Sequence, residues 1–116
     1  MSPYAVGAEG HFSGGGVGFL SCLHGLSINH LYGVEVVVGD AHGRARAVVA
    51  TRNHDDPNRD LWRAHTGGGG GNFGIVTRYL FRSPGVRGSD PAKLLPTPPA
   101  EVLVTAVSWP WAQMTQ

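Results

Sequence analysis

The segment LYGVEVVVGDAHGRARAVVA, residues 31–50, contains two apolar stretches separated by a short polar one. Its first part, Leu31 to Val38, is apolar and rich in β-branched residues, which is typical of a strand. The next residues have turn chemistry, because the Asp40 side chain can bond the backbone that follows it and Gly43 tolerates a positive φ. Residues 44–50 alternate basic and apolar side chains and then become fully apolar. The segment therefore predicts an antiparallel β-hairpin.

Short helices are expected on both sides of the hairpin. Before it, residues 17–24 (VGFLSCLH) predict a short helix that stops at Gly25. After it, Asp56 and Pro57 fit the N-cap and the first position of a helix that runs to about His65. The side chains of this second helix that are expected to face inward are Leu61, Trp62 and Ala64.

A third strand and a proline-rich segment complete the expected organisation. Residues 72–81 return to apolar strand character. Residues 83–99 hold most of the prolines and predict a linker, and residues 101–109 (EVLVTAVSW) predict a final apolar strand. The predicted fold class is therefore α+β, with a mostly antiparallel sheet and flanking short helices.

Composition and charge restrict the classes of function. A chain of 116 residues with 41% hydrophobic residues and a formal net charge of +1 predicts one small domain, without the basic surface of nucleic-acid or membrane-surface binding. No apolar run reaches membrane-spanning length and residues 1–10 lack a signal-peptide pattern, so a soluble, cytoplasmic protein is expected. The lone Cys22 cannot form an internal disulfide, and the six histidines lack metal-binding spacing. No metal site is expected.

Glycine is the outlier in the composition, because the 18 glycines are clustered rather than evenly spread. The first cluster, SGGGVG at residues 13–18, precedes an expected helix, and the second, residues 67–71, links a helix end to a strand. Such clusters serve either as flexible connectors or as backbone N–H donors to phosphate oxygens, with no Cβ in the way. Neither is a Walker A loop, and the hairpin pattern does not support a Rossmann fingerprint.

Five motifs occur in order: GHFSGGGVGFLS at residues 10–21, HGL at 24–26, VEVV at 34–37, Asp60-Leu61, and GGGGGNFGIVT at 67–77. Together they resemble the FAD-binding (PCMH-type) domain of the berberine-bridge-enzyme-like oxidases, in the vanillyl-alcohol-oxidase group of FAD-linked oxidases. The resemblance is to the C-terminal portion of that domain only. By this resemblance residues 1–83 are part of an FAD-binding domain, 84–100 are a linker, and 101–116 open a substrate domain.

The resemblance implies that FAD is the cofactor, held in an extended pose between two subdomains, of which this chain is similar to the second. The residues it places along the flavin and its phosphates are Gly10, His11, Ser13, Gly14, Gly15 and Gly16. The residues it places at the adenine end are Gly74, Ile75 and Val76. An apolar strand edge beside a glycine turn suits this role, because it leaves a flat base unobstructed.

Departures from the family pattern concern the catalytic parts. The family's first subdomain, with the histidine that holds the flavin covalently, is expected before this sequence, and most of the substrate domain, with the catalytic base, after it. Residues 2–5 contain no cysteine where members with a second covalent flavin bond have one. Cys22 stands where the family commonly has arginine, Arg63 where it has tryptophan, and Thr66 where it has arginine. No catalytic residue is therefore expected in this chain.

The resemblance leads to one functional hypothesis, with two others kept open. The first is the FAD-binding portion of an oxidoreductase that moves hydride from an alcohol, sugar or alkaloid-like substrate to FAD and then reduces O₂; the portion is predicted to be inactive by itself. The second is a non-catalytic module or pseudo-enzyme remnant that completes a site with the missing N-terminal subdomain or with another chain. The third is a glycine-rich structural protein. Whether the chain is itself an enzyme is left open.

Overall fold

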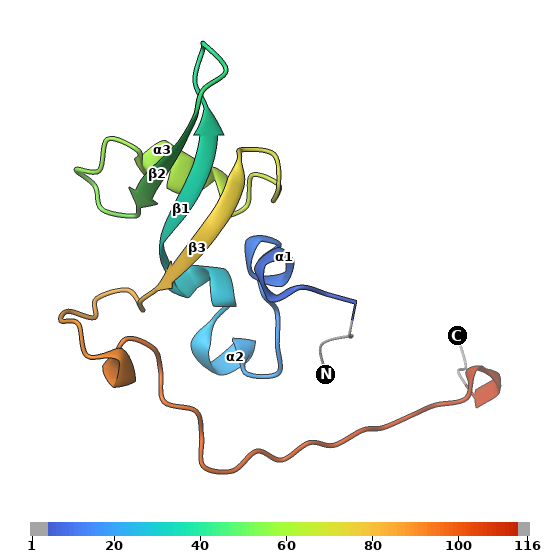
Figure 1. Cartoon of the computed structure of the whole chain (residues 1–116). Helices are drawn as coiled ribbons and strands as arrows, with labels where there is room; N and C mark the ends of the chain where they lie inside the picture. The colour runs from blue at the N-terminus through green and yellow to red at the C-terminus, as the bar shows by residue number, and fades with distance from the viewer. Residues whose placement is uncertain (1–4, 114–116) are drawn as a thin grey trace.

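The computed structural model describes residues 5–113 and contains a three-stranded antiparallel sheet in the order β2-β1-β3. The central strand is β1 (Leu31–Gly39), with β2 (Ala45–Thr51) on one side and β3 (Ile75–Phe81) on the other. Figure 1 shows this sheet with short helices around it and a long C-terminal segment that leaves the body of the molecule. The expected α+β class with a mostly antiparallel sheet is confirmed.

The predicted hairpin is confirmed in its strands and in its turn. The register pairs Val34 with Ala50 along β1 and β2. One carboxylate oxygen of Asp40 accepts hydrogen bonds from the backbone N–H groups of His42 (2.8 Å) and Arg44 (2.9 Å). Gly43 has a φ of 75°, which is the conformation that the turn needs and that a side chain would strain.

The third strand begins at Ile75, three residues later than expected, because residues 72–74 turn the chain onto the sheet. Gly74 makes this turn with a φ of 125°. A Cβ on Gly74 would come within 2.6 Å of the Val37 carbonyl oxygen and 2.7 Å of a Val36 methyl group. The entry of β3 into the sheet therefore requires glycine at this position.

The helices are α1 (Ala8–Ser13), α2 (Ser21–His24) and α3 (Arg59–Ala64), and a 3₁₀ turn, η1 (Ser27–His30), leads into β1. The helix expected at residues 17–24 is shorter than predicted and forms only at its end, although it does stop at Gly25. Its first half is a turn, in which the hydroxyl of Ser21 accepts a hydrogen bond from the Gly18 backbone N–H. Helix α1 was not predicted, because it contains a glycine in its interior, which disfavours a helix.

The expected start of α3 is wrong. Asp56 is not the N-cap and Pro57 is not the first helical residue, since the helix begins at Arg59. The Asp56 carboxylate accepts hydrogen bonds from the Asn58 backbone N–H (2.7 Å) and from the Thr51 backbone N–H (2.8 Å). Asp56 therefore links the loop to the end of β2. Its carboxylate oxygens accept hydrogen bonds there and do not cap the helix.

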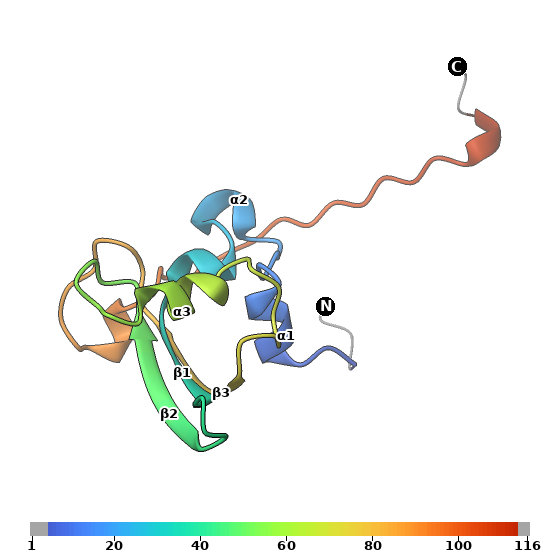
Figure 2. The same cartoon turned by 90° about the horizontal axis from the view of Figure 1, so that it is seen from above.

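The hydrophobic core lies between one face of the sheet and α3, which Figure 2 shows lying on one side of the strands. Its buried residues are Leu31, Val34, Val36 and Ala50. Leu61 and Trp62 of α3 pack against them as predicted, and the Trp62 indole N–H donates to the Leu31 carbonyl oxygen (3.1 Å). Ala64, expected inward as well, is only half-buried and lies outside this cluster. On the other face of the sheet, the side chain of Val49 remains 49% exposed.

The strand expected at residues 101–109 is wrong. These residues form no regular secondary structure and are exposed, and they belong to the long C-terminal segment that leaves the body of the molecule (Figure 1). A strand is stable only when a neighbouring strand satisfies its backbone groups, and none of the described strands lies beside this segment. Short 3₁₀ turns, η2 (Pro91–Lys93) and η3 (Trp111–Gln113), interrupt the C-terminal part. Within residues 5–113, no helix has the length and apolar character needed to cross a membrane.

Candidate functional site

A groove runs between α1, the glycine run of residues 67–71, and the beginning of β3. Its volume is about 670 Å³. Both views of the chain show the glycine run passing beside α1 (Figures 1 and 2). We call it the glycine groove. Six of the nine residues predicted to contact the cofactor line it: Gly10, Ser13, Gly14, Gly74, Ile75 and Val76.

Close contact between Ser13 and Gly70 joins the two sides of the glycine groove. A Cβ on Gly70 would come within 2.6 Å of the Ser13 hydroxyl oxygen, so only glycine permits this approach. The Ser13 hydroxyl in turn donates to the Glu9 carbonyl oxygen (2.9 Å), which fixes its position at the end of α1. Residues that lie nearly sixty positions apart in the sequence are therefore in direct contact.

The polar character of the glycine groove comes mainly from its backbone. Among the described residues, the backbone N–H groups of Gly70 and Gly71, which line the groove, have no hydrogen-bond acceptor. Free N–H groups on glycine can approach an anionic oxygen without steric hindrance. Ile75, whose side chain is 73% exposed, adds an apolar surface at the start of β3. The groove can thus bind a ligand that has both oxygen acceptors and a flat apolar part.

Tyr79 and Glu9 supply the ionisable side chains of the glycine groove. Burial raises the pKa of the Tyr79 phenol, and the negative charge of Glu9 raises it further, whereas a hydrogen bond with Ser13 opposes both effects. The phenol therefore stays protonated at neutral pH and acts as a neutral polar group. The groove offers a neutral phenol and a carboxylate, and neither is placed as a nucleophile activated by a base.

The other three residues predicted to contact the cofactor lie outside the glycine groove. The carbonyl groups of Gly15 and Gly16 point to η1, where they accept hydrogen bonds from the backbone N–H groups of Ile28 (3.2 Å) and Ser27 (3.1 Å). His11 is half-buried at α1, with its ring 6.2 Å from that of Phe12. The end of the first glycine cluster therefore holds the chain against η1.

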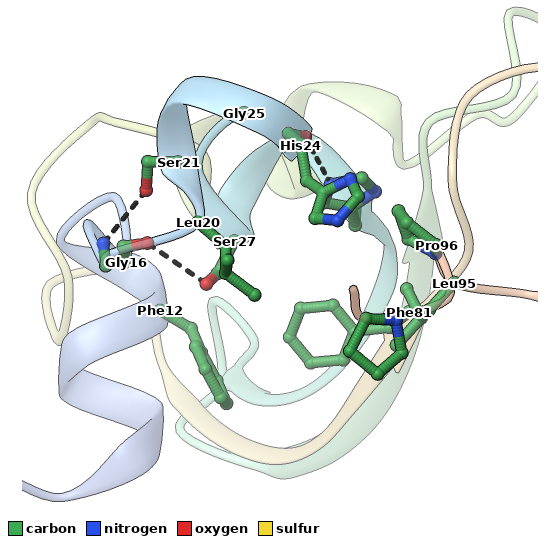
Figure 3. A pocket seen from close by; sticks show the side chains of 13 residues that line it. Phe12, Gly16, Leu20, Ser21, His24, Gly25, Ser27, Phe81, Leu95 and Pro96 are labelled. Carbon is green, nitrogen blue, oxygen red and sulfur yellow. Dashed lines mark hydrogen bonds between the residues drawn. The ribbon is translucent and has the colours of Figure 1, made fainter. Parts of the chain in front are cut away.

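A second cavity, of about 390 Å³, lies on the far side of the first glycine cluster (Figure 3). Phe12, Leu20 and Phe81 form much of its apolar lining, and the segment from Leu95 to Pro98 closes one side. Sequence reasoning missed this pocket, because it treated residues 83–99 as a linker. A hydrogen bond from the Ser83 backbone N–H to the Leu94 carbonyl oxygen (2.8 Å) holds this segment close to the end of β3.

Two histidines belong to the wall of this apolar pocket. His30 Nε2 lies 2.9 Å from the His24 carbonyl oxygen, and His30 Nδ1 lies 2.9 Å from the Ser83 hydroxyl oxygen. Both nitrogens of His30 are therefore used to hold the turn and the linker together. Within the described part of the chain, no group of three or more histidine, cysteine or acidic side chains is arranged to hold a metal ion, and Cys22 is exposed.

Comparison with curated proteins identifies relatives across nearly the whole chain. Aclacinomycin-N/aclacinomycin-A oxidase of Streptomyces galilaeus is 61% identical over 111 residues, which are 96% of this chain and 20% of the relative. Hexose oxidase of Chondrus crispus is 39% identical over 116 residues, 99% of this chain and 19% of the relative. The chain thus spans about a fifth of the length of these relatives. No protein-family model matches the sequence.

Comparison with solved structures gives the same result. The flavoenzyme CrmK, involved in the shunt product recycling mechanism in caerulomycin biosynthesis, matches with a TM-score of 0.77 and 64% sequence identity. The match covers 82% of this chain and 19% of CrmK. Because both the fold and the sequence agree, the likeness reflects common descent as well as a shared arrangement of strands.

Proposed function

We propose that this chain, whose homologues are FAD-linked oxidases of the berberine-bridge-enzyme-like group, forms one wall of an FAD site. The observation that supports the proposal is the glycine groove. It brings Gly10, Ser13 and Gly14 of α1 and its end together with Gly74, Ile75 and Val76 at the start of β3. A surface built from two distant segments is a common way to hold an extended ligand.

The groove fits FAD in its shape and in its donors. Positions 10 and 71 have open space where a Cβ would stand, so a ligand can lie directly on the backbone there. The free N–H groups of the glycine run suit the diphosphate of FAD, and the exposed Ile75 suits a flat ring. When bound, FAD accepts a hydride from the substrate and passes the electrons to O₂. The residues of this chain bind and orient the cofactor, and the hydride-accepting chemistry belongs to the flavin.

We extend the proposal to the parts of the site that this chain does not provide. The second wall of the FAD site would come from a further subdomain, on the same chain or on another. The substrate would be an alcohol group of a sugar, since the relatives include a hexose oxidase and a glucooligosaccharide oxidase. On this view the described residues give cofactor contacts, and the group that accepts the substrate proton comes from elsewhere.

The test is the visible absorbance of the purified chain after incubation with FAD and desalting. We expect a retained flavin band for the wild-type chain. Gly10→Leu fills the groove and should abolish the band, whereas Gly39→Leu, at another position with open space around it, should retain the band. Circular dichroism of each variant verifies that it is folded. A folded wild-type chain that elutes colourless would disprove FAD binding by this chain alone.

A further inference from the structure

Two arginines, one after the end of β2 and one after the end of β3, lie against the ring of Tyr32. Arg82 directly follows β3 and lies with its guanidinium carbon 4.5 Å from the centre of the Tyr32 ring. Arg52 directly follows β2 and lies 5.6 Å from the same ring. Neither arginine lines the glycine groove, whose last residue along β3 is Tyr79. The arginine pair is therefore separate from the proposed FAD wall.

The positive charge of this pair is not balanced by a neighbouring carboxylate. Among residues 5–113, neither Arg52 nor Arg82 forms a salt bridge. Arg52 donates to the neutral Ser83 carbonyl oxygen (2.8 Å), and the Nε of Arg82 is buried without an acceptor. Burial lowers the pKa of Arg52, and the charge of Arg82 lowers it further. Two guanidinium groups that repel each other at a partly buried position favour an anion beside them.

A cavity of about 420 Å³ opens directly onto Arg52. Asn29, an exposed residue, lines the same cavity with its side-chain amide as a further hydrogen-bond donor. Trp62 and Pro84 form apolar walls. The cavity thus combines a guanidinium and an amide with apolar sides, and Arg82 lies beside it on the same Tyr32 ring that Arg52 contacts.

We propose that Arg52 and Arg82, with Asn29 at the opening, form an anion site that takes a phosphate group, either inorganic phosphate or the phosphate of a small molecule. The match of charge favours phosphate, because a phosphate carries close to two negative charges near neutral pH and the pair carries two positive ones. Guanidinium groups also bind phosphate oxygens in a fork-like, bidentate geometry. A carboxylate would neutralise only one of the two arginines.

Calorimetric titration of the full chain at constant ionic strength tests the site, with sodium phosphate, a sugar phosphate, sodium acetate and sodium chloride as the probes. We expect saturable binding of phosphate at one site per chain. Arg52→Gln and Arg82→Gln should each weaken it by about tenfold or more. Arg46→Gln, at an exposed arginine on β2, should leave it unchanged. Tighter binding of the sugar phosphate than of inorganic phosphate would identify a phosphorylated small molecule as the ligand, and equal binding would identify the free ion.

A second variant keeps the test decisive even if an arginine substitution prevents folding. Asn29→Asp places a carboxylate in the cavity that Arg52 lines, where it should pair with the guanidinium and compete with phosphate. We therefore expect weaker phosphate binding and an unchanged unfolding midpoint. Phosphate that binds no better than chloride would overturn the proposal. So would acetate that binds as tightly as phosphate, because the pair would then suit a carboxylate of another protein segment. A loss of binding in Arg46→Gln equal to that in Arg52→Gln would show attraction by overall charge only.

Discussion

The two glycine clusters have nearly the same composition but differ in what surrounds them. The first, at residues 13–18, is fixed to η1 through the carbonyl groups of Gly15 and Gly16, and Gly16 is buried. The second, residues 67–71, is exposed, and it contacts the body of the protein closely at Gly68 and Gly70. Glycine in the first cluster permits close packing, whereas glycine in the second leaves backbone donors open.

The role of a glycine run therefore depends on the surface that lies beside it. In the first cluster the missing Cβ makes room for Ser27, and in the second the missing Cβ makes room for a ligand or for Ser13. Substitutions where a Cβ would meet packed atoms, as at Gly16 and Gly70, should therefore act mainly on stability. A substitution at a groove position with open space, as at Gly10, should act mainly on binding.

Gly16→Ala should have the largest effect. Gly16 has a φ of 69°, and a Cβ there would come within 2.5 Å of the Ser27 Cβ. Left-handed strain and overpacking together should lower the free energy of unfolding by about 3 kcal/mol. Urea denaturation followed by circular dichroism measures the loss.

Gly18→Ala is the matched control for this substitution. It lies in the same cluster, has no positive φ and has open space where the Cβ would stand. Its unfolding free energy should stay within about 0.5 kcal/mol of the wild type. Equal losses at both positions would mean that the first cluster is not held by close packing against η1.

These different roles could not be read from the sequence, although the hairpin could. The hairpin depends on the local pattern of β1 and β2 and on Asp40, whose bonds reach only residues 42 and 44. The packing of Gly16 depends on Ser27, and the glycine groove depends on contact between Ser13 and Gly70. Such contacts follow from the path of the chain in space, which no local pattern encodes.

Gly70→Ala should have the second largest effect on stability. Gly70 has no positive φ, so the penalty comes from the Ser13 hydroxyl, 2.6 Å from where the Cβ would stand. We expect a loss of about 1–2 kcal/mol in the free energy of unfolding. The double variant Ser13→Ala/Gly70→Ala should recover part of it, which a double-mutant cycle quantifies. Additive effects of the two substitutions would show that the two sides of the glycine groove are not in contact.

The remaining sequence predictions divide in the same way. Leu61 and Trp62 pack against the core as predicted, because burying large apolar side chains stabilises the fold, whereas the small Ala64 lies outside the cluster. The start of that helix was misplaced, because Asp56 bonds Thr51 at the end of β2. The strand expected at residues 101–109 failed because a strand needs a neighbour, which periodicity cannot supply. The assignment of the FAD contacts and of the domain boundaries stays a prediction.

Gly10→Ala should have a small effect on stability and of the opposite sign. Gly10 lies inside α1 with open space where a Cβ would stand, so alanine should raise the free energy of unfolding by about 0.5–1 kcal/mol. The same methyl group would project into the glycine groove and should reduce FAD retention after desalting. A variant that is both more stable and equally able to hold FAD would show that Gly10 does not face the cofactor.

Acidification should have the smallest effect on stability, and it should loosen the sheet before it loosens the first glycine cluster. Hydrogen bonds from the Thr51 hydroxyl and from the backbone of Asn58 and Thr51 hold the pKa of Asp56 below its ordinary value. A carboxyl with a depressed folded-state pKa stabilises the fold above its unfolded pKa of about 3.9, and this contribution is lost as the pH falls through the folded value. Asp56→Asn should therefore reduce the fall of the unfolding free energy at acidic pH, measured by urea denaturation from neutral to acidic pH.

The sheet should loosen first on acidification, because its loop and turn depend on carboxylates, whereas the first glycine cluster is bound through carbonyl groups that do not titrate. If hydrogen exchange instead showed η1 opening before β2 as the pH falls, the packing of the first glycine cluster against η1 would not be the more stable part of the fold.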